Sequence, residues 1–239
     1  MKLSKEKIII MCGGRGKRMK DLTLKTPKPL MKIKDKTILE MKIQKYQKEG
    51  FNNFIICIGY KGSLIKKLIS KGNNPENISF SDAGVDAGIL KRIDYAKDLF
   101  NETVLLTYGD TYSNINLSEL AKAHRENNNE ATIAVAPIKS PFGLVEFDNN
   151  NKVTHFKEKP TQTYYIGYAA INKKIIDITP NEIIDMPDGK GLVEFYNMLM
   201  LDKKLGVYYY DGLQTTFNTK NELEIAKEKI INFYTSRQN

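Results

Sequence analysis

The chain has 239 residues, a formal net charge of +9 and a hydrophobic content of 41%, which is enough to bury the core of one large domain or two small ones. Every apolar run falls short of the roughly 20 residues that span a bilayer, and residues 1–7 are too polar for a signal peptide. We therefore expect a cytoplasmic protein that does not bind a membrane.

Cysteine and histidine, with two residues of each, are too few for a zinc cluster or a disulfide framework. Cys12 and Cys57 lie in apolar runs, so we expect buried thiols, while the spacing of His124 and His155 favours surface positions. The lysines are dispersed and accompany no motif that reads nucleic acid. We expect most of this charge to be solvated, with no nucleic acid as partner.

Short apolar runs predict nine strands, and helical patterns separate the early ones. The predicted strands are residues 8–11, 54–58, 78–80, 104–107, 132–137, 144–147, 153–156, 164–171 and 207–210. The predicted helices are residues 37–50, 63–71, 88–100, 117–127, 193–201 and 221–234. The first of these helices has clear end signals, with Thr37 as N-cap, Glu40 three residues later and Gly50 as the stop.

The order of these elements predicts the fold class. Alternating strands and helices in the first half favour a doubly wound, Rossmann-like α/β fold with a mostly parallel mixed sheet flanked by helices. After residue 132 the strands follow one another closely, and the turn at residues 148–151 favours an antiparallel hairpin. The chain has no linker composition, so we expect a single domain over 1–239, with halves at 1–130 and 131–239.

The segment after the first strand is rich in glycine and cations. Glycines in such a turn let backbone N–H groups face a concavity that binds anions, which suits a polyphosphate. It is not a dinucleotide fingerprint, because Met19 stands where the third glycine belongs, and not a P-loop, because Arg18 replaces the hydroxyl residue after Gly16-Lys17. A tight turn with exposed cations remains the alternative.

Lys28 stands between two prolines, Pro27 and Pro29. Each proline fixes its own φ and pushes the preceding residue towards an extended backbone, so Lys28 is expected to be held rigidly. A preorganised ammonium group is what phosphoryl transfer needs for charge stabilisation.

These segments resemble the sugar-1-phosphate nucleotidyltransferases. GGRGKRM at 13–19 and PKPL at 27–30 are similar to the family's GGxGTRL and PKPL, with Lys17 where threonine is usual. GD at 109–110, FGLVEFD at 142–148 and EKP at 158–160 follow in the family's order. Within the family, FIICIGYKG at 54–62, LKR at 90–92 and TYGD at 107–110 most resemble glucose-1-phosphate cytidylyltransferases, although the loop at 86–88 is shorter.

The resemblance implies an enzyme that transfers a nucleoside monophosphate from a triphosphate, with CTP favoured, to a sugar 1-phosphate or similar phosphomonoester, releasing pyrophosphate. A GTP-, UTP- or dTTP-dependent enzyme, such as a heptose 1-phosphate guanylyltransferase, is the alternative within the class. A non-catalytic nucleotide- or RNA-binding protein is the alternative outside it. The resemblance also implies Mg²⁺ as cofactor and leaves a homo-oligomer open.

Site residues carry over from the family position by position. The catalytic residues would be Arg18, Lys28 and Asp110. The nucleotide would be bound by Cys12, Gly13, Gly14, Arg15, Gly16, Lys17, Asp86, Gly88 and Gly109. The acceptor would be bound by Gly143, Glu158, Lys159, Gly167 and Glu194. The metal ligands would be Asp110 and Asn218. At the position of Asn218 many relatives have an aspartate, and Asp211 is the alternative to Asn218.

Overall fold

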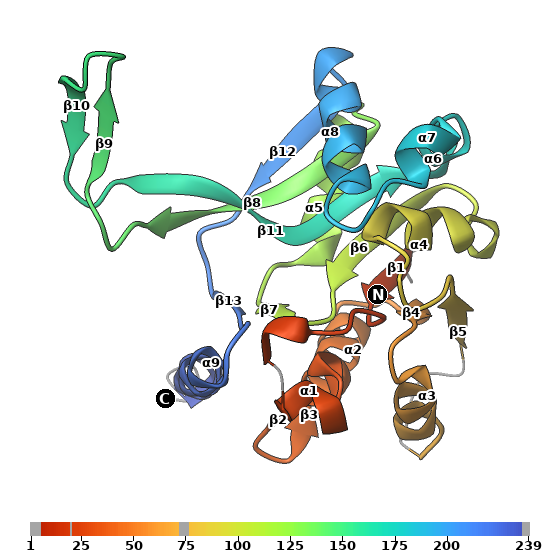
Figure 1. Ribbon diagram of the computed structural model, residues 1–239. Helices are drawn as coiled ribbons and strands as arrows, with labels where there is room; N and C mark the ends of the chain where they lie inside the picture. The colour runs from red at the N-terminus through yellow and green to blue at the C-terminus, as the bar shows by residue number, and fades with distance from the viewer. Residues whose placement is uncertain (1–5, 20, 72–76, 236–239) are drawn as a thin grey trace.

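A seven-stranded mixed sheet forms the centre of the computed structural model, which describes residues 6–19, 21–71 and 77–235 (Figure 1). The strand order is β12-β8-β11-β6-β1-β4-β5. These strands are β1 Lys7–Met11, β4 Asn53–Ile58, β5 Asn77–Asp82, β6 Thr103–Tyr108, β8 Ala131–Lys139, β11 Thr161–Asn172 and β12 Leu205–Tyr209. Only β11 runs antiparallel to its neighbours, so the expected mostly parallel sheet is confirmed.

The inner strands are apolar on both faces because helices cover both faces. Ile8, Ile9 and Ile10 of β1 are all fully buried, with alternate residues in separate core clusters. One face packs against α2 Ile38–Lys48, α3 Gly62–Lys71 and α5 Leu117–Glu126. The other packs against α4 Ile89–Tyr95, α6 Lys173–Asp177, α7 Asn181–Ile184 and α8 Gly191–Leu201. The chain is therefore a three-layer α/β structure.

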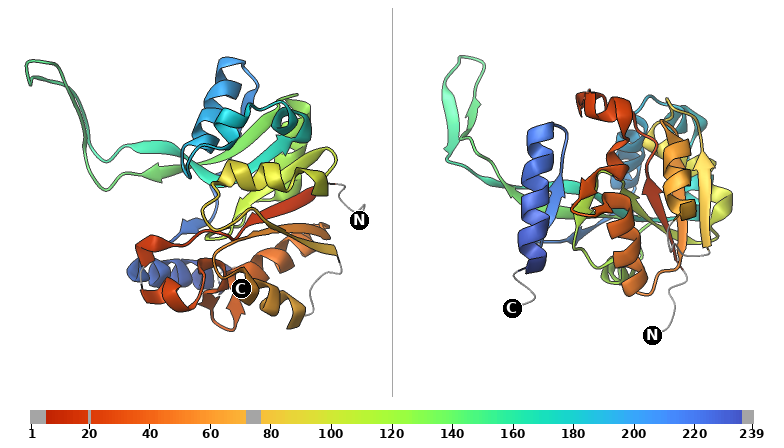
Figure 2. Two further views of the ribbon diagram at one scale, coloured as in Figure 1. Left: turned by 45° about the vertical axis from the view of Figure 1, so that its right-hand side comes forward. Right: turned by 90° about the horizontal axis from the view of Figure 1, so that it is seen from below.

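A third, smaller core lies beside the sheet. It joins the segments after β1 to the end of the chain through buried residues such as Met31, Tyr112 and Phe217. The elements in and next to it are η1 Lys17–Met19, α1 Asp21–Lys25, η2 Lys28–Leu30, β2 Lys32–Ile33, β3 Lys36–Thr37, the start of α2, β7 Thr111–Ser113, β13 Gln214–Thr216 and α9 Lys220–Thr235. Through this core α9, the last helix of the chain, packs near η1 and α1 (Figure 2).

An arm projects from the body of the molecule. Strands β8 and β11 extend beyond the sheet and continue into the hairpin of β9 Leu144–Phe147 and β10 Val153–Lys157 (Figures 1 and 2). The hairpin predicted through residues 148–151 is confirmed, and Asn151 takes a positive φ of 59° in its turn. All five residues of β10 are exposed. Among the described residues, no helix is both long and apolar enough to cross a bilayer.

Most element predictions agree with the structure. Thr37 caps α2 with the expected capping box, in which its side chain accepts from the Glu40 N–H and the Glu40 carboxylate accepts from the Thr37 N–H. The helix expected at 88–100 is shorter, because α4 ends at Tyr95 and a 3-10 turn, η3 Lys97–Leu99, follows. The elements of two to five residues, such as β2, β7, α1 and α6, were not predicted, since so few residues show no clear periodicity.

The surface position expected for His124 is wrong. His124 is 2% exposed on the inner face of α5, with Nδ1 2.9 Å from Thr132 Oγ1 and Nε2 3.0 Å from Asn172 Oδ1. Its place after Leu117 and Leu120 puts it on the buried stripe of that helix. His155 is exposed, and both cysteines are buried thiols, as expected.

Candidate active site

Lys28 lies at the centre of polar groups that three distant segments bring together. Its Nζ is 2.9 Å from Asp110 Oδ2, 3.0 Å from the Phe217 carbonyl oxygen and 3.1 Å from Asn218 Oδ1. An ammonium group has three N–H donors, so these three acceptors satisfy it completely. The Lys28 side chain is 8% exposed. These three contacts hold the cation in place. The extended backbone expected at Lys28 is not found, because Lys28 begins the 3-10 turn η2, with Pro27 as its extended N-cap and a proline tolerated in the first turn.

A small antiparallel ladder places Asn218 next to Asp110. Strand β7 begins directly after Asp110 and pairs with β13, with Thr111 opposite Thr216. Asn218 comes two residues after Thr216, so it lies at the same end of the ladder as Asp110, and both contact Lys28 Nζ. Phe217, between them, is 1% exposed and packs in the third core. Burial of Phe217 thus fixes the carbonyl group that Lys28 contacts.

The glycine-rich loop follows β1 at the carboxyl end of the parallel strands. A Cβ on Gly13 would lie 2.2 Å from Arg92 Nη1 and 2.7 Å from the Ile58 carbonyl oxygen, so only glycine fits there. Gly16 has a φ of +61°, which favours glycine. Apart from its chain neighbours, no atom of the described residues lies within 4 Å of a Cβ placed on Gly14. The loop conformation therefore depends on Gly13 and Gly16.

The other nucleotide-binding candidates surround this loop. Arg15 Nη2 and Nε both donate to Asp86 Oδ1, at 2.9 and 3.2 Å, and both side chains are exposed, so the pair is a surface ion pair. Gly88 is the N-cap of α4. A Cβ on Gly109 would lie 2.5 Å from the Met11 carbonyl oxygen. The remaining candidates are the buried Cys12 and the exposed Lys17 on η1, next to Arg18, the predicted catalytic arginine, which is also exposed.

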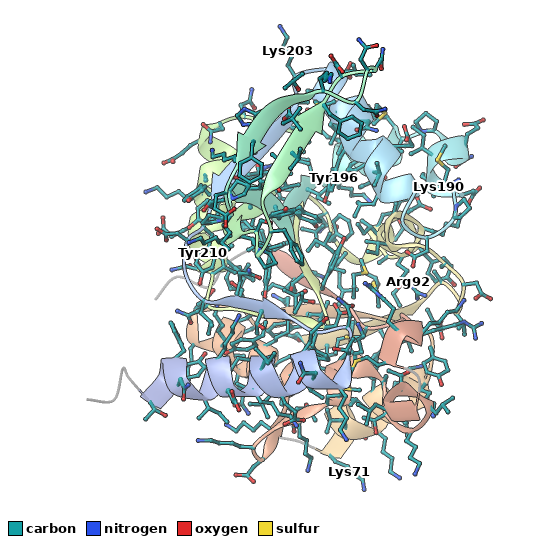
Figure 3. All side chains as sticks on the ribbon, turned by 60° about the vertical axis from the view of Figure 1, so that its left-hand side comes forward. Lys71, Arg92, Lys190, Tyr196, Lys203 and Tyr210 are labelled. Carbon is teal, nitrogen blue, oxygen red and sulfur yellow. The ribbon has the colours of Figure 1, made fainter. Side chains whose placement is uncertain are left out.

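Arg92 supports the loop from beneath and was not among the predicted site residues. It is 4% exposed and donates to the carbonyl oxygens of Ile58 at 2.6 Å, Val85 at 3.3 Å and Gly13 at 3.4 Å (Figure 3). Burial lowers the pKa of its guanidinium, although nearby acidic groups oppose the shift. Its spacing on α4 does not follow that of the apolar residues Leu90 and Ile93, so the sequence gives no local signal that it is buried.

Lys42 is a second buried cation that the sequence prediction missed. It is 1% exposed on α2, and its Nζ donates to the Thr111 carbonyl oxygen at 2.6 Å and to the Tyr168 hydroxyl at 2.9 Å. Burial, together with the nearby charge of Lys45, lowers its pKa to about 7. Lys42 therefore ties the residue after Asp110 to the strand that carries Gly167.

The acceptor-binding candidates are not gathered at Lys28. Gly167 has a φ of +77° and packs against the Tyr108 ring, where a Cβ would lie 2.8 Å from ring atoms. Glu194 is exposed in the first turn of α8. Gly143, Glu158 and Lys159 lie where the arm bends between β8, β9, β10 and β11, away from the sheet (Figure 1). Their roles remain predictions.

The donor set at Lys28 fits a hard divalent cation. Mg²⁺ in proteins takes one or two carboxylate or amide oxygens and fills its other positions with phosphate and water. Asp110 Oδ2 and Asn218 Oδ1 both accept from Lys28 Nζ, so the two side chains lie close together, and a metal ion held by them would lie beside the Lys28 ammonium group. The described residues contain no group of three or more His, Cys, Asp or Glu side chains arranged to hold a metal ion.

The chain is similar in sequence to known nucleotidyltransferases. The model of the nucleotidyl transferase family matches residues 7–224. A probable glucose-1-phosphate cytidylyltransferase of Bacillus subtilis is 35% identical over 92% of this chain and 95% of its own. The glucose-1-phosphate cytidylyltransferase of Salmonella typhimurium is 29% identical over 74% of this chain and 79% of its own. Other relatives are named as uridylyl- and guanylyltransferases.

A solved structure supports the fold. HddC from Yersinia pseudotuberculosis superposes with a TM-score of 0.73, covering 94% of this chain and 99% of its own, at 20% sequence identity. With a family model over nearly the whole length and a relative above 30% identity, the chain belongs to the nucleotidyl transferase family and is an enzyme of its sugar-phosphate nucleotidyltransferase type.

Proposed function

We propose that the protein transfers a cytidylyl group from CTP to a sugar 1-phosphate, giving a CDP-sugar and pyrophosphate. The observation that carries the proposal is the cluster of Lys28, Asp110 and Asn218 beside the glycine loop. The choice of CTP rests on the named function of the Bacillus subtilis relative and on the LKR and TYGD segments. The half at 1–130 would bind the triphosphate, and the half at 131–239 would bind the acceptor.

The proposed reaction requires that the negative charges of the triphosphate and the sugar phosphate are neutralised and that the two groups are aligned. A sugar-phosphate oxygen attacks the α-phosphorus and pyrophosphate leaves, so no covalent enzyme intermediate is needed. Lys28 would stabilise the negative charge from a fixed position, and the exposed Arg18 would reach the leaving phosphates. Loss of one such donor typically reduces the rate by about 10²–10³-fold.

Asp110 and Asn218 would hold Mg²⁺, which supplies positive charge next to the phosphates when bound. Asn218 offers a neutral oxygen, and the ion pair of Asp110 with Lys28 keeps its carboxylate close to Asn218, which also accepts from Lys28. The Asn218→Asp variant is therefore expected to lower the Mg²⁺ concentration required for half-maximal activity. A well-folded variant with no activity, or with an unchanged Mg²⁺ requirement, would show that Asn218 does not face the metal.

Pyrophosphate release with CTP, UTP, GTP and dTTP, each paired with a panel of sugar 1-phosphates, tests the function itself. CTP is expected to give the highest kcat/KM. A higher value for another triphosphate would assign a different base, and no release with any pair would remove the proposed activity.

The Lys28→Ala variant tests the role of the fixed cation. We expect turnover to fall by at least ~10²-fold, with a cooperative unfolding transition retained. Lys48→Ala is the matched control, because Lys48 is exposed at the end of α2. Equal activity of the two variants would contradict the assignment.

For the acceptor, we propose that Glu158 contacts a sugar hydroxyl and Lys159 contacts the sugar phosphate. The Lys159→Ala variant should raise KM for the sugar 1-phosphate and leave KM for the triphosphate unchanged. Equal changes in both values would argue for a structural role of the arm.

A further inference from the structure

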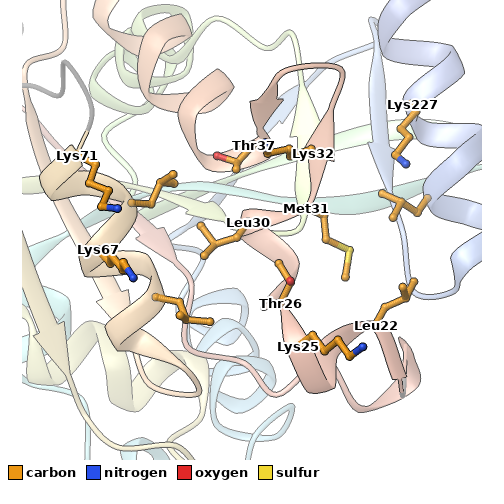
Figure 4. A pocket seen from close by; sticks show the side chains of 13 residues that line it. Leu22, Lys25, Thr26, Leu30, Met31, Lys32, Thr37, Lys67, Lys71 and Lys227 are labelled. Carbon is orange, nitrogen blue, oxygen red and sulfur yellow. The ribbon is translucent and has the colours of Figure 1, made fainter.

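A pocket separate from the active site opens between α3 and α9 (Figure 4). Its volume is about 860 Å³, which lies in the range typical of small-molecule sites. Its walls come from α1, α3, α9 and the segment between η2 and β2. None of Lys28, Asp110 and Asn218 lines it.

The floor of the pocket is apolar and in part exposed. The apolar residues that line it are Leu22, Leu30, Met31, Leu64, Leu68 and Leu223. Leu64 is 37% exposed, and Leu22, Leu30 and Leu68 are partly exposed, so apolar surface from several segments faces the opening. Burial of such a surface under an aliphatic group is favourable because water leaves both surfaces.

The rim of the pocket is positively charged. The lysines that line it are Lys25, Lys32, Lys67, Lys71 and Lys227. Lys227 pairs with Glu224 at 2.9 Å, whereas the other four form no ion pair within the parts of the chain that the structure describes. No Asp or Glu among the described residues lines the pocket. Unpaired cations beside a low-dielectric wall attract an anion more strongly than cations on an open surface.

We propose that this pocket binds one molecule of an anionic amphiphile, with its aliphatic chain on the leucine floor and its anionic head group at the lysine rim. A simple phosphate ion would leave the floor exposed. A second copy of this chain is disfavoured by its net charge of +9. The hollow shape favours a single molecule over a flat bilayer surface. The proposal does not depend on the reaction proposed above.

Calorimetric titration with dodecyl phosphate, below the concentration at which it forms micelles, tests this site. We expect saturable binding of one molecule per chain. The Lys67→Glu/Lys71→Glu variant should weaken binding by at least ~10-fold, because two attractive charges become repulsive. Lys152→Glu/Lys203→Glu carries the same charge change on exposed residues elsewhere, with Lys203 at the opposite end of the molecule from Lys71 (Figure 3). This control should bind as the wild type does.

Two further ligands separate the contributions of chain and head group. Dodecyltrimethylammonium has the same chain with a cationic head, and inorganic phosphate has an anionic head without a chain. Neither should bind to saturation at the concentrations that saturate with dodecyl phosphate. Equal binding of either ligand, unchanged affinity of Lys67→Glu/Lys71→Glu, or binding to anionic phosphatidylglycerol vesicles without binding to the monomeric amphiphile would each overturn the proposal.

Discussion

The buried amine of Lys42 should make the free energy of unfolding rise with pH just above neutrality. In the folded protein, burial lowers the Lys42 pKa from its usual 10.5 to about 7. In the unfolded chain the amine keeps its proton up to the usual pKa. Between these two values the unfolded state binds more protons than the folded state, so raising the pH stabilises the fold.

The size of the effect follows from the same two values. Where the unfolded state binds one more proton than the folded state, each pH unit changes the free energy of unfolding by about 1.4 kcal/mol. Lys42 is half titrated in the folded state near its lowered pKa, so the gain between about pH 7 and pH 8.5 is about 1.5 kcal/mol. The window ends below pH 9 because the thiols of Cys12 and Cys57 ionise there in the unfolded chain. Burial raises the pKa of both thiols in the folded protein, so their ionisation in the unfolded chain lowers the free energy of unfolding above that pH.

Urea unfolding of the wild type and of Lys42→Met across this pH window measures the effect. Methionine has a similar shape but no proton to exchange, so the variant should lose most of the rise. The hydrogen bonds lost at Thr111 and Tyr168 shift its stability by an amount that does not vary with pH. Lys48→Met, on the exposed end of the same helix, should keep the rise. A full rise in Lys42→Met would refute the reasoning.

Three other substitutions probe separate contacts. Thr37→Ala removes the capping box of α2 and should cost ~1 kcal/mol in chemical unfolding; a cost near zero would show that the cap is not formed. Arg92→Met removes a donor from the carbonyl groups of Ile58, Val85 and Gly13, although the Gly13 carbonyl keeps the Tyr60 N–H, and should cost at least ~2 kcal/mol and weaken triphosphate binding in a titration. Arg15→Ala breaks an exposed ion pair, so its unfolding free energy should change by less than ~0.5 kcal/mol.

The sequence predicts the central layers of this fold well. Continuous apolar runs identify β1, β4 and β6, because strands covered on both faces need apolar side chains in both directions. The hairpin of β9 and β10 is visible in its Asp-Asn-rich turn, and α2 in its capping residues. These signals are local, so a single pass along the chain finds them.

The contacts that assemble the site are not local. Asn218 meets Lys28 because two three-residue strands, β7 and β13, pair across about half of the chain, and no periodicity marks so short a pairing. The burial of Lys42, by contrast, is indicated by its spacing in the sequence. It stands four residues after Ile38 and four before Tyr46, within the apolar stripe of α2. Composition assigns lysine to the surface, whereas its spacing assigns this one to the core.

The cations around the proposed active site divide into two groups with different tasks. Lys28 is buried, and Asp110 offsets its charge, so it contributes little to the field that an approaching triphosphate meets. Lys17 and Arg18 are exposed on η1 and supply that field, whereas Arg15 is partly offset by Asp86. On the proposed function, raised salt should therefore lower kcat/KM for the triphosphate through the exposed cations, while kcat, set by the fixed position of Lys28, should depend on salt much less.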